Sequence, residues 1–280
     1  MNKFGGEWTE DKMTVFMKYV KAFLQIMKNK RFYKLLYFDG FAGSGSISQN
    51  DDFEIIQGVA TQVLSIDEPR EFDIYYFVEK NKKNADHLRN LISQRFPNKK
   101  AFVAQDNCNQ KIIDLANFLN REENKNYRGL VFIDPYGMQL QWSAMQALKG
   151  INVDVWLLFP SGIGVGRLLR RDGKIESTWM NRLIKFTGMT EEDIMAYFYR
   201  TETTNTLFGE ELTIYKEKKA VERAVELYKK RIQKESLFKY VSESLVLKNS
   251  IGFTMYDFFM CTNNPIALKI ANDINKIHRK

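Results

Sequence analysis

Five short apolar segments, each followed by a polar or glycine-containing turn, constrain the fold of this chain more than any other feature. Helical patterns separate the segments, which cover residues 33–38, 73–78, 101–104, 130–133 and 153–159. Strands that alternate with helices in this way predict a parallel sheet with helices on both faces. In such sheets ligands bind beyond the carboxyl ends of the strands, which is where the polar turns of this chain fall.

The same pattern predicts how the chain is organised. A helix over residues 9–29, with Thr9 as its N-cap, belongs to an N-terminal part, 1–30. A Rossmann-like core covers 31–161 and 240–280 and closes with an antiparallel hairpin of 241–247 and 255–261. The charged stretch 162–239 breaks the alternation, and we expect a helical insertion or cap there. The expected fold class is therefore α/β, a doubly wound sheet that is mostly parallel.

The scarcity of histidine and cysteine excludes several enzyme classes. The chain has only His87, His278, Cys108 and Cys261, and neither histidine lies in a zinc-protease or nucleophile-elbow motif. Zinc hydrolases, zinc deaminases and Ser-His-Asp hydrolases are therefore disfavoured, and we expect no metal site.

Charge and hydropathy give coarser indications. No apolar run reaches membrane-spanning length, and the acidic residues at 7, 10 and 11 do not suit a secretory signal, so we expect a cytoplasmic protein without a membrane span. The net charge of +8 favours a polyanionic partner such as RNA or DNA. A mildly basic enzyme without such a partner has the same composition.

The first apolar segment ends in a glycine-rich turn, residues 39–45. Glycine lets a backbone approach a ligand closely, and the N–H groups of a helix expected after the turn would suit a carboxylate or phosphate. We predict cofactor contacts from Asp39, Phe41, Ala42, Gly43 and Gly45. A tight structural turn is the alternative explanation of the same glycines.

Acidic residues close the second and third apolar segments. Glu79, followed by Lys80, stands where a carboxylate can take both ribose hydroxyls, and Asp106, followed by Asn107, stands where a base edge can be read. Each acid alone is more often a helix N-cap or a solvated residue. The order of glycine turn, Glu79 and Asp106 predicts a nucleoside lying across the sheet. A nicotinamide dinucleotide is disfavoured, because its acidic residue follows about 20 residues after the glycines, whereas Glu79 follows Gly45 by 34 residues (79 − 45).

The fourth apolar segment ends in Asp134-Pro135-Tyr136-Gly137. A carboxylate here can hydrogen-bond an amino group, proline fixes the backbone, and an aromatic ring can stack on a base. The tetrapeptide is also favourable for a plain β-turn. At a strand end beside a nucleoside site, it predicts the place where the second substrate binds.

Basic and aromatic residues elsewhere complete the candidate site. Arg167, Arg170 and Arg171 follow the fifth apolar segment and could bind substrate phosphates, or they could form a solvated helix face. Trp8 and Lys12 on the opening helix could cover the cofactor, or Trp8 could anchor the start of the helix.

Residues 7–12, 37–45, 132–137 and 153–160 together resemble the three-Cys-motif partner protein family. The resemblance covers most of the chain, including the late hairpin, and is weakest in the charged insertion. It implies a bacterial protein with a methyltransferase-like fold and S-adenosyl-L-methionine (SAM) as cofactor. The family also implies a separate partner protein, radical-SAM-like, with a three-cysteine motif.

The chain is more distantly similar to Rossmann-like methyltransferases of adenine amino groups, whose signature is an acidic residue or Asn followed by Pro-Pro-aromatic. Here Tyr136 takes the place of the second proline and Gly137 that of the aromatic residue. The similarity implies that Asp134 orients the amino group, Pro135 offers its carbonyl and Tyr136 packs on the substrate. We therefore expect a SAM-dependent methyltransferase acting on a base amino group of nucleic acid. A non-catalytic, methyltransferase-like partner subunit is the alternative.

Overall fold

One mixed sheet forms the centre of the protein, and its strands run in the order β10-β12-β7-β6-β1-β4-β5, with β11 paired to β12. The computed structural model describes residues 7–44, 46–48, 55–206 and 209–278. Five strands are parallel: β1 (Lys34–Asp39), β4 (Ile74–Val78), β5 (Ala101–Ala104), β6 (Tyr127–Ile133) and β7 (Val153–Phe159). β12 (Thr254–Thr262) runs antiparallel to β7, and β10 (Tyr240–Val241) and β11 (Leu245–Lys248) each pair antiparallel with β12.

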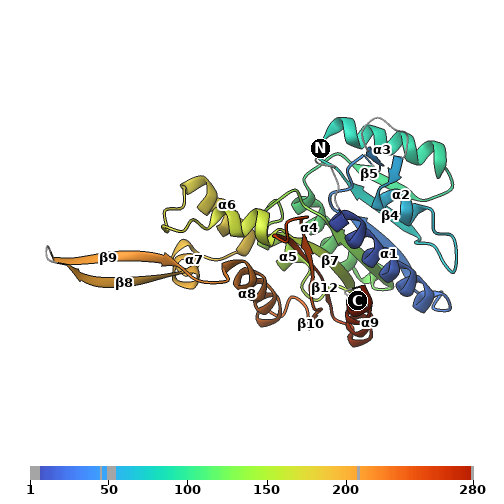
Figure 1. The fold of residues 1–280 in the computed structure, drawn as a ribbon. Helices are drawn as coiled ribbons and strands as arrows, with labels where there is room; N and C mark the ends of the chain where they lie inside the picture. The colour runs from blue at the N-terminus through green and yellow to red at the C-terminus, as the bar shows by residue number, and fades with distance from the viewer. Residues whose placement is uncertain (1–6, 45, 49–54, 207–208, 279–280) are drawn as a thin grey trace.

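Helices cover both faces of this sheet (Figure 1) because successive strand residues point to opposite sides. In β1, Leu35 and Tyr37 join one buried cluster, and Leu36 and Phe38 join the other. The first cluster is covered by α1 (Glu7–Met27), α2 (Val59–Leu64), α3 (Lys82–Arg95) and α9 (Pro265–His278). The second is covered by α4 (Cys108–Asn120), α5 (Trp142–Ala147) and the helices of the insertion. The predicted fold class is confirmed: the protein has an α/β, Rossmann-like doubly wound sheet that is mostly parallel.

Two local predictions near the N-terminus were wrong. Helix α1 begins at Glu7, so Thr9 lies inside the helix and is not its N-cap. The glycine turn is followed by an antiparallel pair, β2 (Ser46–Ser48) and β3 (Ile55–Gln57), and not by a helix. The next helix, α2, begins only at Val59, so its first turn cannot serve as the expected anion site.

The insertion between β7 and β10 is only partly helical. It contains η2 (Ser161–Gly166), α6 (Ser177–Thr187), α7 (Glu191–Phe198) and α8 (Ala220–Lys234). Between α7 and α8 an antiparallel hairpin of β8 (Tyr199–Thr206) and β9 (Gly209–Lys216) projects from the body of the protein (Figure 1). The expectation of a wholly helical stretch is therefore corrected. Many residues of this hairpin are β-branched and favour extended backbone.

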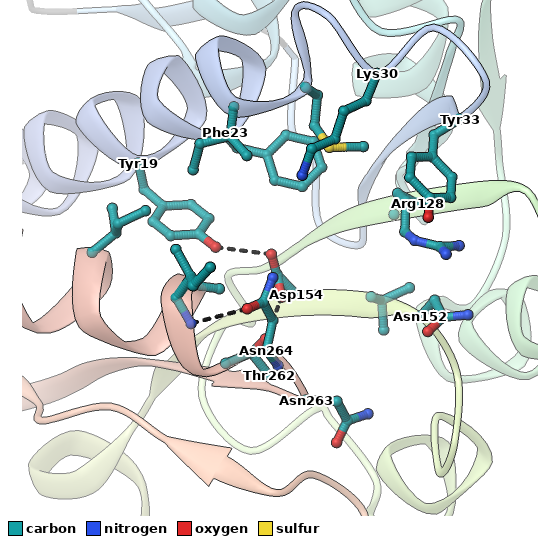
Figure 2. A pocket seen from close by; sticks show the side chains of 17 residues that line it. Tyr19, Phe23, Lys30, Tyr33, Arg128, Asn152, Asp154, Thr262, Asn263 and Asn264 are labelled. Atoms are coloured by element: carbon teal, nitrogen blue, oxygen red, sulfur yellow. Dashed lines mark hydrogen bonds between the residues drawn. The ribbon is translucent and has the colours of Figure 1, made fainter.

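A buried carboxylate fixes the position of α1 across the sheet. Asp154, near the start of β7, accepts hydrogen bonds from the hydroxyl of Tyr19 on α1, at 2.8 Å, and from the hydroxyl of Thr262 at the end of β12. These three residues line a cavity of about 300 Å³ between α1, α9 and the starts of β6 and β7 (Figure 2). Burial raises the pKa of Asp154. This hydrogen-bonded group of Tyr19, Asp154 and Thr262 lies at the amino edge of the parallel strands, opposite the polar turns.

Candidate cofactor and acceptor site

A cavity of about 660 Å³ lies at the carboxyl edge of the parallel strands. The strand order reverses here, because β4 and β5 lie on one side of β1 and β6 and β7 on the other. Such a switch point is the usual ligand crevice of a doubly wound sheet, and the volume is typical of small-molecule sites. The loops after β1, β4, β5 and β6 supply most of its lining: Gly40, Phe41, Glu79, Lys80, Asn81, Asn84, Asp106, Asn107, Asn109, Tyr136, Gln139 and Gln141.

Glu79 connects the glycine turn to the loop after β4. Its carboxylate accepts hydrogen bonds from the backbone N–H groups of Gly43, at 3.0 Å, and Asn81, at 2.6 Å. Gly43 has a φ of +62°, so this position favours glycine, and no atom lies within 4 Å of where its Cβ would stand. A carboxylate has about four acceptor sites. Glu79 can therefore accept hydroxyl groups of a ligand while it holds the turn.

Asp39 holds the glycine turn from its buried side and does not line the cavity. It is 2% exposed, and it accepts hydrogen bonds from the N–H of Phe41, at 3.1 Å, and the hydroxyl of Tyr37, at 3.4 Å. Burial is the main cause that raises its pKa to about 7, and the nearby Asp134 carboxylate adds to the shift. Asp39 is therefore poised to change its charge near neutral pH. Its predicted contact with a cofactor remains a prediction.

Asp106 and its neighbours organise the far side of the cavity. Asp106 accepts a hydrogen bond from the N–H of Asn107 at 2.6 Å and pairs with Lys111 at 3.1 Å, and these contacts lower its pKa. Asn107 caps α4 through the N–H of Asn109.

Asn109, which the sequence did not single out, fixes the loop after β6. Its side chain donates to the carbonyl of Gln139 at 2.9 Å and accepts from the N–H of Gln141 at 2.7 Å. Nothing in the sequence pattern pointed to this role, because Asn109 is one of several polar residues that follow the third apolar segment.

Asp134 follows β6 and forms an ion pair with Lys12 of α1. Lys12 is 5% exposed, and its ammonium lies 5.5 Å from the ring centre of Trp8. The Trp8 ring in turn lies 4.9 Å from that of Tyr256 on β12. Burial, with a contribution from Asp134, raises the pKa of Tyr256 to about 12. The N-terminal half of α1 therefore covers Asp134, and the expectation that Trp8 and Lys12 cover a cofactor remains a prediction.

Tyr136 connects Asp134 to the cavity. It lines the cavity and is 72% exposed, so its ring is available to a ligand. Gly137, with a φ of +73°, turns the chain immediately afterwards.

Two exposed apolar side chains lie farther along the carboxyl edge, in the turn before β12. Asp257 of β12 pairs with Phe159 of β7, so the turn that precedes β12 lies at the edge where β7 ends. In this turn Ile251 is 86% and Phe253 51% exposed. The Phe253 ring comes within 3.0 Å of where a Cβ on Gly162 would stand.

The three predicted phosphate-binding arginines lie outside the cavity. Arg170 pairs with Asp172 at 3.3 Å, and its carbonyl accepts a hydrogen bond from Tyr199 at the base of the β8–β9 hairpin. Arg167 and Arg171 are exposed and form no ion pair within the described ranges.

The remaining predicted residues divide into three groups. Those that line the cavity are Phe41, Glu79, Lys80, Asp106, Asn107 and Tyr136. Those that build the neighbouring turns are Asp39, Ala42, Gly43, Asp134 and Pro135. Gly45 lies outside the described residues.

Neither a metal-binding cluster nor a membrane-spanning helix occurs in the part of the chain that the structure describes. No group of three or more His, Cys, Asp or Glu side chains in the described ranges could hold a metal ion. Both cysteines are free and buried. No helix within the described part of the chain is long and apolar enough to cross a membrane.

Comparison with known proteins gives no match to a family model and no match to a curated protein. Among solved structures, protein LPL1258 from Legionella pneumophila, of the family DUF519, is 14% identical, with a TM-score of 0.43 over 84% of this chain and 94% of that one. Trm1 from Pyrococcus horikoshii, solved with SAM, is 9% identical, with a TM-score of 0.37 over 91% of this chain and 64% of that one. The methyltransferase domain of bacterial CtHen1 is 9% identical, with a TM-score of 0.38 over 89% of this chain and 99% of that one. At such low identity, the geometry of the site has to carry the functional assignment.

Proposed function

We propose that this chain is a SAM-dependent methyltransferase that modifies an amino group of a nucleic-acid base. One observation carries the proposal: Glu79, Asp106 and Tyr136 line a single cavity at the switch point of the sheet, with Asp134 next to Tyr136. The residues proposed to bind ribose, to read the base and to receive the acceptor therefore meet at one strand edge.

The residues of the cavity fit SAM as a ligand. Gly43 leaves open space beside the turn, and Glu79 has acceptor capacity for ribose hydroxyls. Asp106 and Asn107 offer a carboxylate and an amide for a base edge. When bound, SAM would supply an electrophilic methyl group on a sulfonium.

Asp134 and Tyr136 would receive the second substrate. The Asp134 carboxylate accepts a hydrogen bond from the substrate amino group and so directs the nitrogen lone pair. The exposed Tyr136 ring packs on the base that carries this amino group. Methyl transfer to nitrogen requires alignment more than acid–base catalysis, and this suits a site built from one carboxylate and one ring.

Three features favour a nucleic acid as this substrate. The net charge is +8, which attracts a polyanion. Phe253 and Ile251 are exposed farther along the same edge, and unpaired bases stack on aromatic rings such as those of Tyr136 and Phe253. Arg167 and Arg171 leave their guanidinium groups available for phosphates.

A protein partner with a three-cysteine motif completes the proposal, and the chain would belong to the family named for that partner. The β8–β9 hairpin offers a surface for such a contact. It pairs with no other strand of the described sheets, and Leu212 and Tyr215 on it are 68% and 42% exposed. An isolated two-stranded hairpin is only marginally stable in water, so contact with a partner would stabilise it.

Methyl transfer from labelled SAM to denatured and duplex RNA and DNA tests the proposal. The wild type should label one of these substrates, and Asp134→Ala should lose at least about 100-fold in rate without losing SAM binding. Glu123→Ala removes an exposed carboxylate that lies outside the cavity and should remain active.

SAM binding without transfer to any nucleic acid, even with the partner added, would contradict the catalytic assignment. It would favour the second candidate, a non-catalytic partner subunit, which the displaced aromatic of Asp134-Pro135-Tyr136-Gly137 already supports.

A further inference from the structure

Lys12 is a buried cation in a position where an apolar residue would be expected. It lies on the sheet-facing side of α1, as do the buried residues Met13, Phe16 and Tyr19, and it is 5% exposed. Burying an ammonium group is costly unless the group is paired. Its partner in the structure is the carboxylate of Asp134, 122 residues away in the chain.

The ion pair occupies only half of the Asp134 carboxylate. Lys12 binds Oδ2, and within the described part of the chain Oδ1 accepts no hydrogen bond. The Asp134 side chain remains 26% exposed, whereas that of Lys12 is 6% exposed. One oxygen is therefore held from the buried side, and the other is left for a molecule bound beside Asp134.

We infer that Lys12 is a positioning residue that orients Asp134 for the substrate amino group, an inference that rests on the proposed function. Lys12 fixes the rotation of the carboxylate by holding Oδ2, and Oδ1 then accepts the hydrogen bond of the substrate. Trp8 lies over the ammonium, and Tyr256 lies against Trp8, so the lysine is itself held in place.

A purely structural role accounts less well for this lysine. Helix α1 is already held in place by the hydrogen bond from Tyr19 to Asp154 of β7 and by the contact of Asp11 with His278 of α9. A buried ion pair also adds little net stability compared with apolar residues of similar size. The lysine is therefore better explained by what it does to Asp134 than by what it does for the helix.

A double-mutant cycle in single-turnover methyl transfer tests this role, with Lys12→Met, Asp134→Asn and the double variant. Lys12→Met should slow transfer by about 100-fold, because a misplaced hydrogen-bond acceptor loses alignment. In the Asp134→Asn background the same change should cost less than about threefold, since Lys12 acts only through Asp134. Lys12→Arg keeps the charge and should recover part of the rate.

Two controls separate positioning from folding. Lys18→Met removes an exposed lysine from the same helix and should leave the rate unchanged. All rates are compared at saturating SAM, so a change in SAM affinity caused by the altered charges near Asp39 does not enter the comparison. If Lys12→Met lowers SAM affinity or the melting temperature, the transfer rate of Lys12→Arg distinguishes positioning from folding. A rate above that of Lys12→Met supports positioning.

Three results would overturn the inference. Losses that add in the double variant would mean that Lys12 acts independently of Asp134. A faster Lys12→Met variant would mean that the lysine blocks the substrate. A wild type that transfers no methyl group to nucleic acid would instead overturn the proposed function, and this inference with it.

Discussion

Replacing Asp39 by asparagine should change how the stability of the protein depends on pH. Burial raises the pKa of Asp39 from 3.8 to about 7. Between these values the carboxyl is protonated in the folded chain and ionised in the unfolded chain, so unfolding releases a proton and stability falls as the pH rises. At about 1.4 kcal/mol per pH unit, the wild type loses about 4 kcal/mol through this group by pH 7.

Asp39→Asn should remove this loss, because an asparagine oxygen can still accept the hydrogen bond from the N–H of Phe41. Urea unfolding of both proteins, followed by tryptophan fluorescence across the range from acid to pH 8, measures the difference in unfolding free energy. The difference should grow in favour of the variant up to about pH 7 and then level off. Asp193→Asn, at an exposed position, should follow the wild type. Parallel curves for Asp39→Asn and wild type would refute the reasoning.

Three further predictions concern the same edge of the sheet. The SAM affinity of the wild type should rise as the pH passes through about 7, because a cationic ligand favours ionised Asp39, and titrations of Asp39→Asn should show a flatter dependence. Gly40→Ala should lower stability by about 1–3 kcal/mol, because its Cβ would stand 2.5 Å from Sγ of Cys108, and adding Cys108→Ala should restore the melting temperature. Tyr136→Ala should leave stability within about 0.5 kcal/mol, since the ring is 72% exposed, but raise the KM for nucleic acid at least about fivefold.

The strands of the core could be predicted from the sequence because their signal is local. Apolar runs bounded by turn residues gave the limits of β5 and β7 as the structure has them. The β8–β9 hairpin was missed although Thr201, Thr203, Leu212 and Ile214 are all β-branched or apolar and alternate with other residues. Helical patterns on both sides of this segment outweighed that short alternation.

The candidate site was predictable only in part, for a reason of geometry. The carboxyl ends of parallel strands meet at one edge of a sheet. Glu79, Asp106 and Tyr136 could therefore be expected near one another because each follows the end of a predicted parallel strand. The pairing of Lys12 with Asp134 depends on how α1 crosses the sheet, which is set by distant contacts such as that between Tyr19 and Asp154. The burial that shifts Asp39 is likewise a property of the assembled layers.

Calorimetric titration of SAM and S-adenosylhomocysteine into wild type, Glu79→Ala and Glu123→Ala tests the central claim most directly. Glu79 is 8% exposed and holds the glycine turn at the cavity, whereas Glu123 is exposed in the short helix η1 (Glu122–Asn124). Micromolar binding by wild type and Glu123→Ala that is lost in Glu79→Ala is the predicted result. Absence of binding by the wild type, or unchanged binding by Glu79→Ala, would contradict a nucleoside site at these strand ends.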